Sequence, residues 1–217
     1  MLQYTPMKNG NRVIKTLWFD LGNVVLFFDF EPAFKKLSRY TRLKLPEIRS
    51  YFKQNPRLEE HLDEGRISAS HLYHRLVRDL DLNGCSFGEF KRIWNRIFKE
   101  NQPVVNLVGR LKRNGYRLIL ISNTNRLHYE YLVKHYPVLS KFDHHVLSFR
   151  VGARKPKQKI FKRALSLSRA KREEIYYTDD RNDLTHAALS NHGIHTHTFH
   201  GIGYMRRDLR RLGVRIQ

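Results

Sequence analysis

Cysteine is nearly absent from this sequence, and so are long apolar segments. Cys85 is the only cysteine among 217 residues, so no intrachain disulfide can form, which fits a reducing cytoplasm. A membrane span needs about 20 consecutive apolar residues. The longest apolar stretches here, Thr16–Phe19 and Val24–Phe28, are separated by a loop that contains Asp20 and Asn23. The first twelve residues are polar and lack the apolar core of a secretory signal. We therefore expect a cytoplasmic protein without a membrane-spanning segment.

Acidic residues are scarce relative to basic ones. The chain has 20 Asp and Glu against 41 Lys and Arg, a formal net charge of +21, and the basic residues are spread along its whole length. Such a field attracts anions, which include phosphorylated metabolites, nucleic acid and acidic surfaces. A generally basic proteome or a solubility requirement would produce the same composition. Because the aromatic residues between 31 and 102 have the spacing of packed helices, we do not expect nucleic-acid binding as the main function. The sequence does not indicate an oligomeric state.

The order of expected elements indicates the fold class. From Glu31 to about Gln102 the apolar residues recur at helical spacing, which predicts several helices and no strand. Elsewhere strands and helices alternate, which predicts right-handed crossovers and a parallel sheet. Strands are expected at 16–19, 116–121, 145–149, 175–178 and 194–199, and helices at 104–113, 127–134, 157–167, 184–191 and 204–211.

The helical block follows the first strand directly, which predicts two domains. We expect residues 13–30 and 103–217 to form an α/β core, and residues 31–102 to form a helical cap domain inserted above one sheet edge. In a parallel sheet the ligand site lies beyond the carboxyl ends of the strands. The residues at those ends are therefore the candidates for chemistry.

Polar and charged side chains follow four of the expected strands or the loops after them. They are Asp20, Ser122, Asn123, Lys155, Asp179 and Asp180. A carboxylate can attack phosphorus, while an ammonium group and hydrogen-bond donors hold the phosphoryl oxygens. A divalent metal would neutralise charge between them, and Mg²⁺ prefers one or two carboxylates together with other hard oxygen ligands. This set predicts phosphoryl transfer to a carboxylate.

Each of these residues also has an ordinary structural explanation. Asp20 could simply end a strand, Ser122 could belong to a turn, and Lys155 could be one more surface lysine. The Asp179–Asp180 pair could cap the helix that follows. The hypothesis of an active site depends on their joint placement, because the predicted fold brings all of them to one edge.

The histidines suggest a metal cluster less strongly. His195 and His197 alternate along an expected strand and share one face, with His200 just beyond it. No carboxylate or cysteine lies between them, so we interpret them as part of a half-exposed terminal strand. The pair His144–His145 receives the same interpretation.

Four segments resemble the motifs of the haloacid dehalogenase-like hydrolases, in the usual order and spacing. They are Phe19–Val25, Leu120–His128, Gly152–Pro156 and Tyr177–Asp180. The first two are similar almost letter for letter to the α-D-glucose-1-phosphate phosphatase branch, and the resemblance covers about residues 13–200. It implies an α/β fold with a Rossmann-like parallel sheet core, helices on both faces and an inserted all-helical cap. It also implies a phosphoric monoester hydrolase that works through an aspartyl-phosphate intermediate.

The resemblance implies a role for each residue of the site. Asp20 would be the nucleophile, and Lys155 would be catalytic by stabilising the phosphoryl charge and would also contact the substrate. Ser122 and Asn123 would bind the substrate phosphate.

It also implies Mg²⁺ as the cofactor. Asp20, the backbone carbonyl of Gly22, and Asp180 would be its ligands, with Asp179 or Asp183 as support.

Two positions depart from the superfamily pattern. Gly22 stands where most phosphatases of the superfamily carry an Asp that acts as general acid and base, a contribution typically worth about 10²–10⁴-fold in rate. The glucose-1-phosphate phosphatase branch resembles this chain in having Gly there, and Asn23 is a candidate substitute. Leu184 stands where Asp or Asn is frequent, and Arg181 adds a positive charge beside the expected metal site, which leaves metal affinity open.

Three hypotheses follow for the function. The first is a magnesium-dependent phosphatase for a small phosphorylated metabolite, with sugar phosphates as one candidate class. The second is a dehalogenase, in which Asp20 would attack carbon without a metal; the Asp179–Asp180 pair argues against it. The third is a catalytically weak protein that acts as a binding or regulatory module for anionic partners. The cap loops would choose the substrate, and the expected turn at Glu64–Gly65 faces it, without a contact that we can assign.

Overall fold

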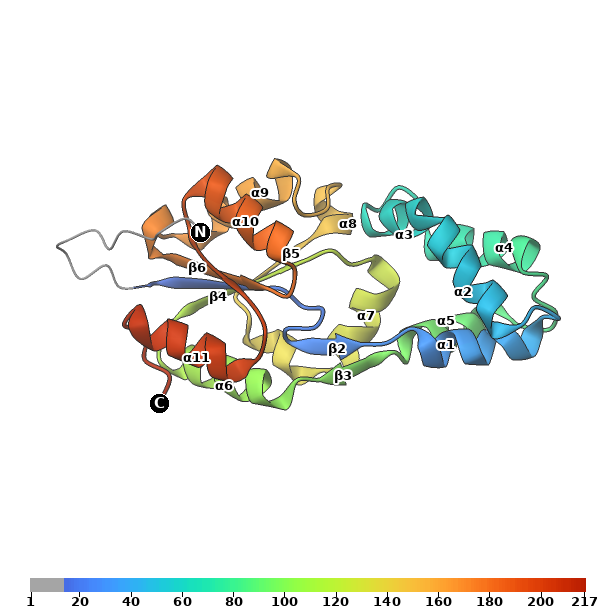
Figure 1. The fold of residues 1–217 in the computed structure, drawn as a ribbon, viewed down its shortest axis with the longest axis horizontal. Coiled ribbons are helices and arrows are strands. Elements are labelled where there is room, and N and C mark those ends of the chain that lie inside the picture. The colour runs from blue at the N-terminus through green and yellow to red at the C-terminus, as the bar shows by residue number, and fades with distance from the viewer. Residues whose placement is uncertain (1–13) are drawn as a thin grey trace.

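The centre of the molecule is a five-stranded parallel sheet with the strand order β5-β4-β1-β6-β7 (Figure 1). The computed structural model describes residues 14–217; the polar N-terminal segment and the first residue of the expected core lie outside the described residues. The strands are β1 (Thr16–Phe19), β4 (Arg117–Ser122), β5 (His144–Leu147), β6 (Ile175–Asp179) and β7 (His195–Thr198). All four pairings are parallel, which confirms the predicted α/β class.

Helices cover both faces of this sheet (Figure 1). One face packs on α6 (Gln102–Arg113) and α11 (Ile202–Arg211), and the other on α9 (Gln158–Ser168) and α10 (Asn182–His192). Successive side chains of a strand point to opposite faces. Leu17 and Phe19 of β1 therefore enter the first core, whereas Trp18 enters the second. Burial on both faces explains why the central strands are uninterrupted apolar runs.

Five helices between β1 and α6 form a separate apolar core beside the carboxyl ends of the strands (Figure 1). They are α1 (Glu31–Leu37), α2 (Leu45–Gln54), α3 (Pro56–Asp63), α4 (Ala69–Asp79) and α5 (Phe87–Asn95). Two further helices, α7 (Arg126–His135) and α8 (Ser148–Val151), follow β4 and β5, and short 3₁₀ turns lie at Ser38–Tyr40, Pro137–Lys141 and Arg172–Glu174. None of the described helices combines the length and the apolar character that a bilayer crossing requires.

Two local predictions are wrong. A strand, β3 (Phe98–Glu100), lies inside the block expected to be only helical, and it pairs antiparallel with β2 (Leu26–Phe28). Three residues are too few to show the period of a strand, and the partner lies about 70 positions away. The expected strand at 145–149 ends at Leu147, because Ser148–Val151 turns into a helix that Gly152 closes in the left-handed conformation (φ 71°).

The turn after α3 lies directly against α8. Gly65 has a φ of +69°, and a Cβ atom added to it would lie 2.7 Å from the backbone oxygen of Phe149. Glycine is needed here both for the left-handed conformation and for the close approach of two backbones. This turn therefore helps to hold the helices α1–α5 against the sheet.

Replacement of this glycine tests the close approach. Gly84 has a similar φ of +74° but open space around the added Cβ, so it is a matched control. We expect Gly84→Ala to lower the free energy of unfolding by about 1–2 kcal/mol, the cost of a left-handed alanine. Gly65→Ala should lower it by at least about 1 kcal/mol more, because its Cβ meets backbone that cannot swing away. Urea unfolding measures both, and equal losses would contradict a tight contact at Gly65.

Candidate active site

Three neighbouring strands deliver their final residues to one edge of the sheet. Asp20 follows β1 directly, and its backbone N–H donates to the Thr178 carbonyl of β6 at 2.9 Å. Ser122 ends β4 and Asp179 ends β6, on the two sides of β1. The edge therefore collects a hydroxyl and two carboxylates from segments more than 50 residues apart in the sequence.

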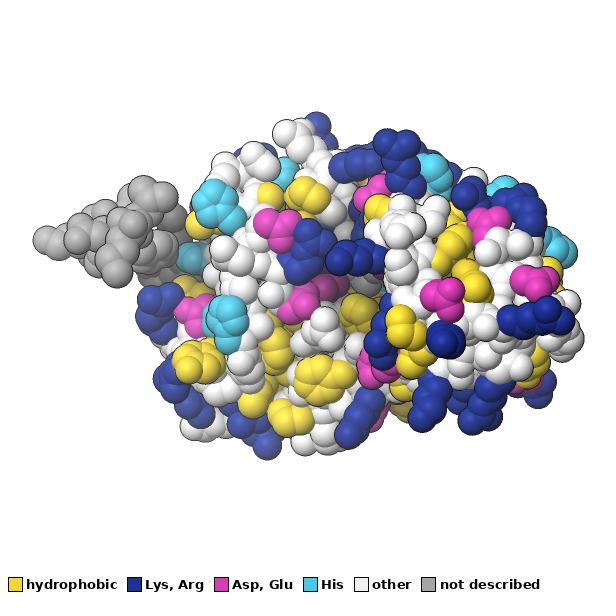
Figure 2. Space-filling model, turned by 45° about the vertical axis from the view of Figure 1, so that its right-hand side comes forward, with side chains coloured by type: hydrophobic (Ala, Val, Ile, Leu, Met, Phe, Trp, Pro, Cys, Tyr) yellow, Lys and Arg dark blue, Asp and Glu magenta, His cyan; other side chains and the backbone are white. Residues whose placement is uncertain are grey.

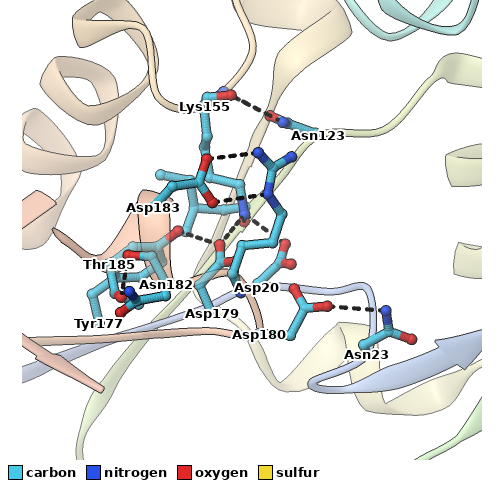
Figure 3. Close-up of polar contacts among 12 residues, drawn as sticks. Asp20, Asn23, Asn123, Lys155, Tyr177, Asp179, Asp180, Asn182, Asp183 and Thr185 are labelled. Atoms are coloured by element: carbon cyan, nitrogen blue, oxygen red, sulfur yellow. Dashed lines mark hydrogen bonds and ion pairs between the residues drawn. The ribbon is translucent and has the colours of Figure 1, made fainter. Parts of the chain in front are cut away.

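Lys155 joins these strand ends (Figure 3). Its Nζ donates to Asp20 Oδ1 at 2.7 Å, to Asp179 Oδ2 at 2.6 Å and to the Ile121 carbonyl at 3.1 Å. Three acceptors use all three N–H donors of the ammonium group. The side chain is 1% exposed, so Lys155 is not a surface lysine.

Asn123 holds the loop that carries this lysine. Its Oδ1 accepts from the Lys155 backbone N–H at 2.7 Å, and its Nδ2 donates to the Lys155 carbonyl at 3.2 Å (Figure 3). The side-chain amide therefore braces Lys155. Ser122 is buried beside it at the end of β4.

Asp179 is bound from three sides. Oδ2 accepts from Lys155 and from the Tyr177 hydroxyl, and Oδ1 accepts from the Arg181 backbone N–H at 3.0 Å. Tyr177 was missed by the sequence analysis. Its position two residues before Asp179 on one strand was the available signal, because such residues share a face.

The acidic residues of this edge could hold a cation. One ligand atom from each of Asp20, Asp179 and Asp180 lies within 4.8 Å of the others, and no second such group of His, Cys, Asp and Glu occurs among residues 14–217. Asn23 donates to Asp180 Oδ2 at 3.0 Å and so orients that carboxylate (Figure 3). Both oxygens of Asp179 already accept hydrogen bonds, whereas Asp20 accepts through Oδ1 alone, so Asp20 and Asp180 are the more available ligands.

Asp183, the other expected support, does not join this group. Its side chain is 58% exposed and forms an ion pair with Arg181, with 2.6 Å between Nη2 and Oδ2 (Figure 3). The charge of Arg181 is thus balanced by Asp183 beside the site.

Burial and charge set the protonation states. Burial raises the pKa of Asp20 to about 7, although Lys155 opposes the shift. Burial would also raise the pKa of Asp179, but Lys155 and Tyr177 outweigh it and hold that pKa below its ordinary value. Burial disfavours the ammonium form of Lys155, yet the charges of Asp179 and Asp20 prevail and raise its pKa. Lys155 therefore stays charged, whereas Asp20 exchanges its proton near neutral pH.

A cavity of about 130 Å³ opens over this edge, between the strand ends and the helices α1–α5. Gly22, Ser122 and Asn123 form its polar end. Phe28 also lines it, and a Cβ atom added to Gly22 would lie 2.8 Å from Cε1 of that ring. A side chain at the position of the usual acid and base would therefore contact the Phe28 ring, which would have to move.

The histidines singled out in the sequence have separate partners. His145 contacts the Tyr129 hydroxyl and the Leu139 carbonyl. His195 contacts the Glu173 carbonyl, and His197 lies 3.5 Å from a carboxylate oxygen of Asp208. The structure therefore does not gather them around one point.

Comparison with solved structures agrees with this fold. A crystal structure of a haloacid dehalogenase (HAD) family enzyme from Bacteroides thetaiotaomicron matches with 25% identity and a TM-score of 0.74, over 86% of this chain and 93% of that one. The same enzyme has been crystallised with magnesium and inorganic phosphate. A HAD-like hydrolase from Porphyromonas gingivalis matches with 23% identity and a TM-score of 0.72, over 91% and 98% of the two chains. An L-2-haloacid dehalogenase from Xanthobacter autotrophicus shares the fold, with 15% identity and a TM-score of 0.60 over 85% and 76%.

The sequence model of one family covers most of the chain. It is the model of the haloacid dehalogenase-like hydrolases, and it matches residues 14–190. The sheet edge, the four motif segments and this match agree, and the chain belongs to the haloacid dehalogenase-like hydrolases.

Proposed function

We propose that this protein is a magnesium-dependent phosphatase that hydrolyses a small phosphomonoester through an aspartyl-phosphate intermediate. The observation that carries the proposal is the buried Lys155 ammonium, held between Asp20 and Asp179 with Asp180 within reach. The similar enzyme crystallised with magnesium and phosphate supports it. The resemblance to the α-D-glucose-1-phosphate phosphatase branch makes sugar phosphates one candidate class of substrate.

The residues of the sheet edge would divide the chemistry among them. The Asp20 carboxylate attacks phosphorus, and the alcohol leaves with the electron pair of its P–O bond and takes up a proton. Water then hydrolyses the acyl phosphate, which regenerates Asp20 and releases inorganic phosphate. Lys155 would stabilise the charge on the phosphoryl oxygens, while the Ser122 hydroxyl and the second Nδ2–H of Asn123, whose first donates to the Lys155 carbonyl, would donate hydrogen bonds to them.

The donor set fits a magnesium ion. Asp20, the Gly22 carbonyl and Asp180 would hold it, and they are the hard oxygen ligands that Mg²⁺ prefers. When bound, the ion supplies positive charge that offsets repulsion between the carboxylates and the phosphate. Asn23 and Lys155 keep Asp180 and Asp179 oriented around it.

We further propose that residues 31–102 act as a cap domain over a core formed by residues 13–30 and 103–217, and that the protein works in the cytoplasm. Figure 2 shows Lys and Arg side chains scattered over the visible face of the molecule rather than gathered in one patch. On this face the distribution is not the continuous basic surface by which nucleic acids are bound, and we propose a small anionic substrate as the main partner.

A second function is favoured by one observation, the ring of Phe28 beside Gly22. Without a general acid at that position, turnover could be slow enough for the protein to act as a binding or regulatory module for anionic partners. A dehalogenase receives less support, because the acidic group next to Lys155 would repel an anionic substrate unless a cation were bound.

Replacement of the nucleophile tests the main proposal. We expect phosphate release from p-nitrophenyl phosphate to require Mg²⁺, and Asp20→Asn to lower kcat by roughly 10⁴-fold or more. Asp81→Asn is the matched control, since Asp81 is exposed and its φ of 49° suits asparagine. Activity of Asp20→Asn close to that of the wild type would refute the proposal.

The raised pKa of Asp20 predicts pH-dependent metal affinity. Only the carboxylate form binds a cation, so Mg²⁺ affinity should rise as the pH increases from 6 to 8 through the pKa of about 7. Isothermal titration calorimetry in two buffers of different ionisation enthalpy measures the proton released on binding. A Mg²⁺ affinity that does not change between pH 6 and 8 would contradict the binding of Mg²⁺ by an Asp20 carboxylate with a pKa of about 7.

The contact between Gly22 and Phe28 predicts coupled substitutions. Gly22→Asp alone must displace the Phe28 ring, whereas in a Phe28→Ala background the new carboxyl has space. We expect the two changes to be non-additive in activation free energy by at least about 0.5 kcal/mol, with the larger gain in kcat in the Phe28→Ala background. The readout is kcat for an alkyl phosphate, whose poor leaving group needs a general acid. The same gain in both backgrounds would mean that Phe28 does not obstruct position 22.

A further inference from the structure

The cavity over the sheet edge carries information about the substrate beyond its phosphate. Its lining away from Gly22, Ser122 and Asn123 is mostly aromatic or aliphatic and comes largely from the helices α1–α5. Those apolar residues are Phe28, Phe30, Phe34, Phe52, Leu58, Leu62, Leu72, Trp94, Ile97 and Phe98, with Leu21 next to the nucleophile. If the phosphate lies at the strand ends, as the proposed function requires, the alcohol part of the ester enters this apolar space.

Four aromatic residues of the lining, Phe30, Phe34, Phe52 and Trp94, pack against one another and form what we call the aromatic wall. Phe52 packs against Phe34 and Trp94, with ring centroids 4.9 and 5.3 Å away, and those two rings are 6.4 Å apart. Phe30 lies 5.0 Å from Trp94. Rings packed at these distances hold one another in place. The wall therefore presents a preformed apolar surface.

Several polar side chains of the lining are already paired, and one of them, the His128 ring, stacks on Trp94 with 6.5 Å between the ring centroids. Asn125 accepts from the His128 backbone N–H at 3.0 Å and lies 3.4 Å from Asp63 Oδ1. The His128 ring contacts Asn95 Oδ1 at 3.1 Å, and burial lowers the pKa of His128 to about 3, so this ring is neutral. These pairings leave the carboxyl groups of Glu59 and Asp63 as the main acceptors for a hydroxyl group in the cavity.

One polar atom of the aromatic wall is without a partner. Trp94 Nε1 is buried and has no hydrogen-bond partner among the described residues. Glu59 and Asp63 also line the cavity, and their carboxyl groups disfavour a second anionic group on the substrate. The surroundings therefore suit an uncharged group with few polar atoms.

The size of the cavity indicates the size of the alcohol part of the substrate. An enclosed apolar protein cavity of about 150 Å³ holds one benzene molecule. This cavity measures about 130 Å³ with its polar end included and is open to solvent, so its volume indicates a small group without setting an upper limit. We propose that the substrate is the phosphate monoester of an uncharged, mainly apolar alcohol about the size of a benzyl group, and that Phe52 and Trp94 form the wall against which this group packs. This inference rests on the proposed phosphatase function and specifies its substrate class. A hexose would instead place most of its hydroxyls against the apolar side chains, with the carboxyl groups of Glu59 and Asp63 as acceptors for only some of them, which is unfavourable.

A comparison of three substrates on the wild-type protein with saturating Mg²⁺ tests the inference. Benzyl phosphate and glucose 6-phosphate are both esters of primary alcohols, and acetyl phosphate reports on the chemistry without a large leaving group. We expect kcat/KM for benzyl phosphate to exceed that for glucose 6-phosphate by about 10²-fold, because hydroxyls left unpaired oppose binding. Equal values, or a preference for glucose 6-phosphate, would overturn the inference while phosphatase function stands. No hydrolysis of any of the three would overturn both.

A pair of variants tests the role of the aromatic wall. Phe52→Ala should lower the ratio of kcat/KM for benzyl phosphate to that for acetyl phosphate by about tenfold or more. Phe87→Ala is the matched control: Phe87 is a partly buried aromatic residue of the same helical core that does not line the cavity, so the ratio should not change. If Phe52→Ala unfolds the helices, the milder variant Phe52→Leu replaces it, and circular dichroism verifies that the variant is folded. An unchanged ratio in both Phe52 variants would show that the wall does not bind the substrate.

Discussion

The structure depends on one buried ammonium group, that of Lys155, held between the carboxylates of Asp20 and Asp179. A buried charge without a partner is strongly destabilising, so removal of either side of such a pair leaves an uncompensated ion. Asp20 after β1, Asp179 at the end of β6 and the loop after α8 that carries Lys155 therefore meet at one point in the folded protein. Because the same charges that satisfy Lys155 are those that phosphoryl transfer needs, the folding requirement and the proposed chemistry coincide at this edge.

The sheet edge is negatively charged, whereas the molecule as a whole is positively charged. Three carboxylates and one ammonium leave a formal charge of −2 in a chain whose net charge is +21. Burial raises the pKa values of Asp20 and Asp180 and so favours their neutral forms, which lowers the negative charge of the edge. With all three carboxyl groups ionised, a divalent cation would neutralise the formal charge of −2. The basic surface would then attract the anionic substrate toward an edge that becomes neutral once the metal is present.

The helices α1–α5 add a second constraint of a different kind. Their aromatic residues pack into one core that closes over the strand ends, and that core also borders the cavity. Periodicity in the sequence was enough to predict these helices, since Phe90 and Trp94 recur at helical spacing. It was not enough to show that Phe30, Phe52 and Trp94 also face the strand ends, because the same pattern describes any packed helix. It also failed for Phe98–Glu100, where a three-residue strand depends on a distant partner.

The sequence by itself determined the α/β class, the order of the strands along the chain and the residue types at their carboxyl ends. These follow from local periodicity and from the rule that parallel strands share an edge. Only the tertiary structure decided which of those residues touch. In the folded protein the amide of Asn123 contacts the Lys155 backbone, and the Tyr177 hydroxyl donates to Asp179. Asp183 pairs with Arg181, and Phe28 lies beside Gly22. The physical reason is that hydrogen bonds and close contacts are resolved over a few ångströms between segments far apart in the chain, a distance that residue spacing alone does not encode.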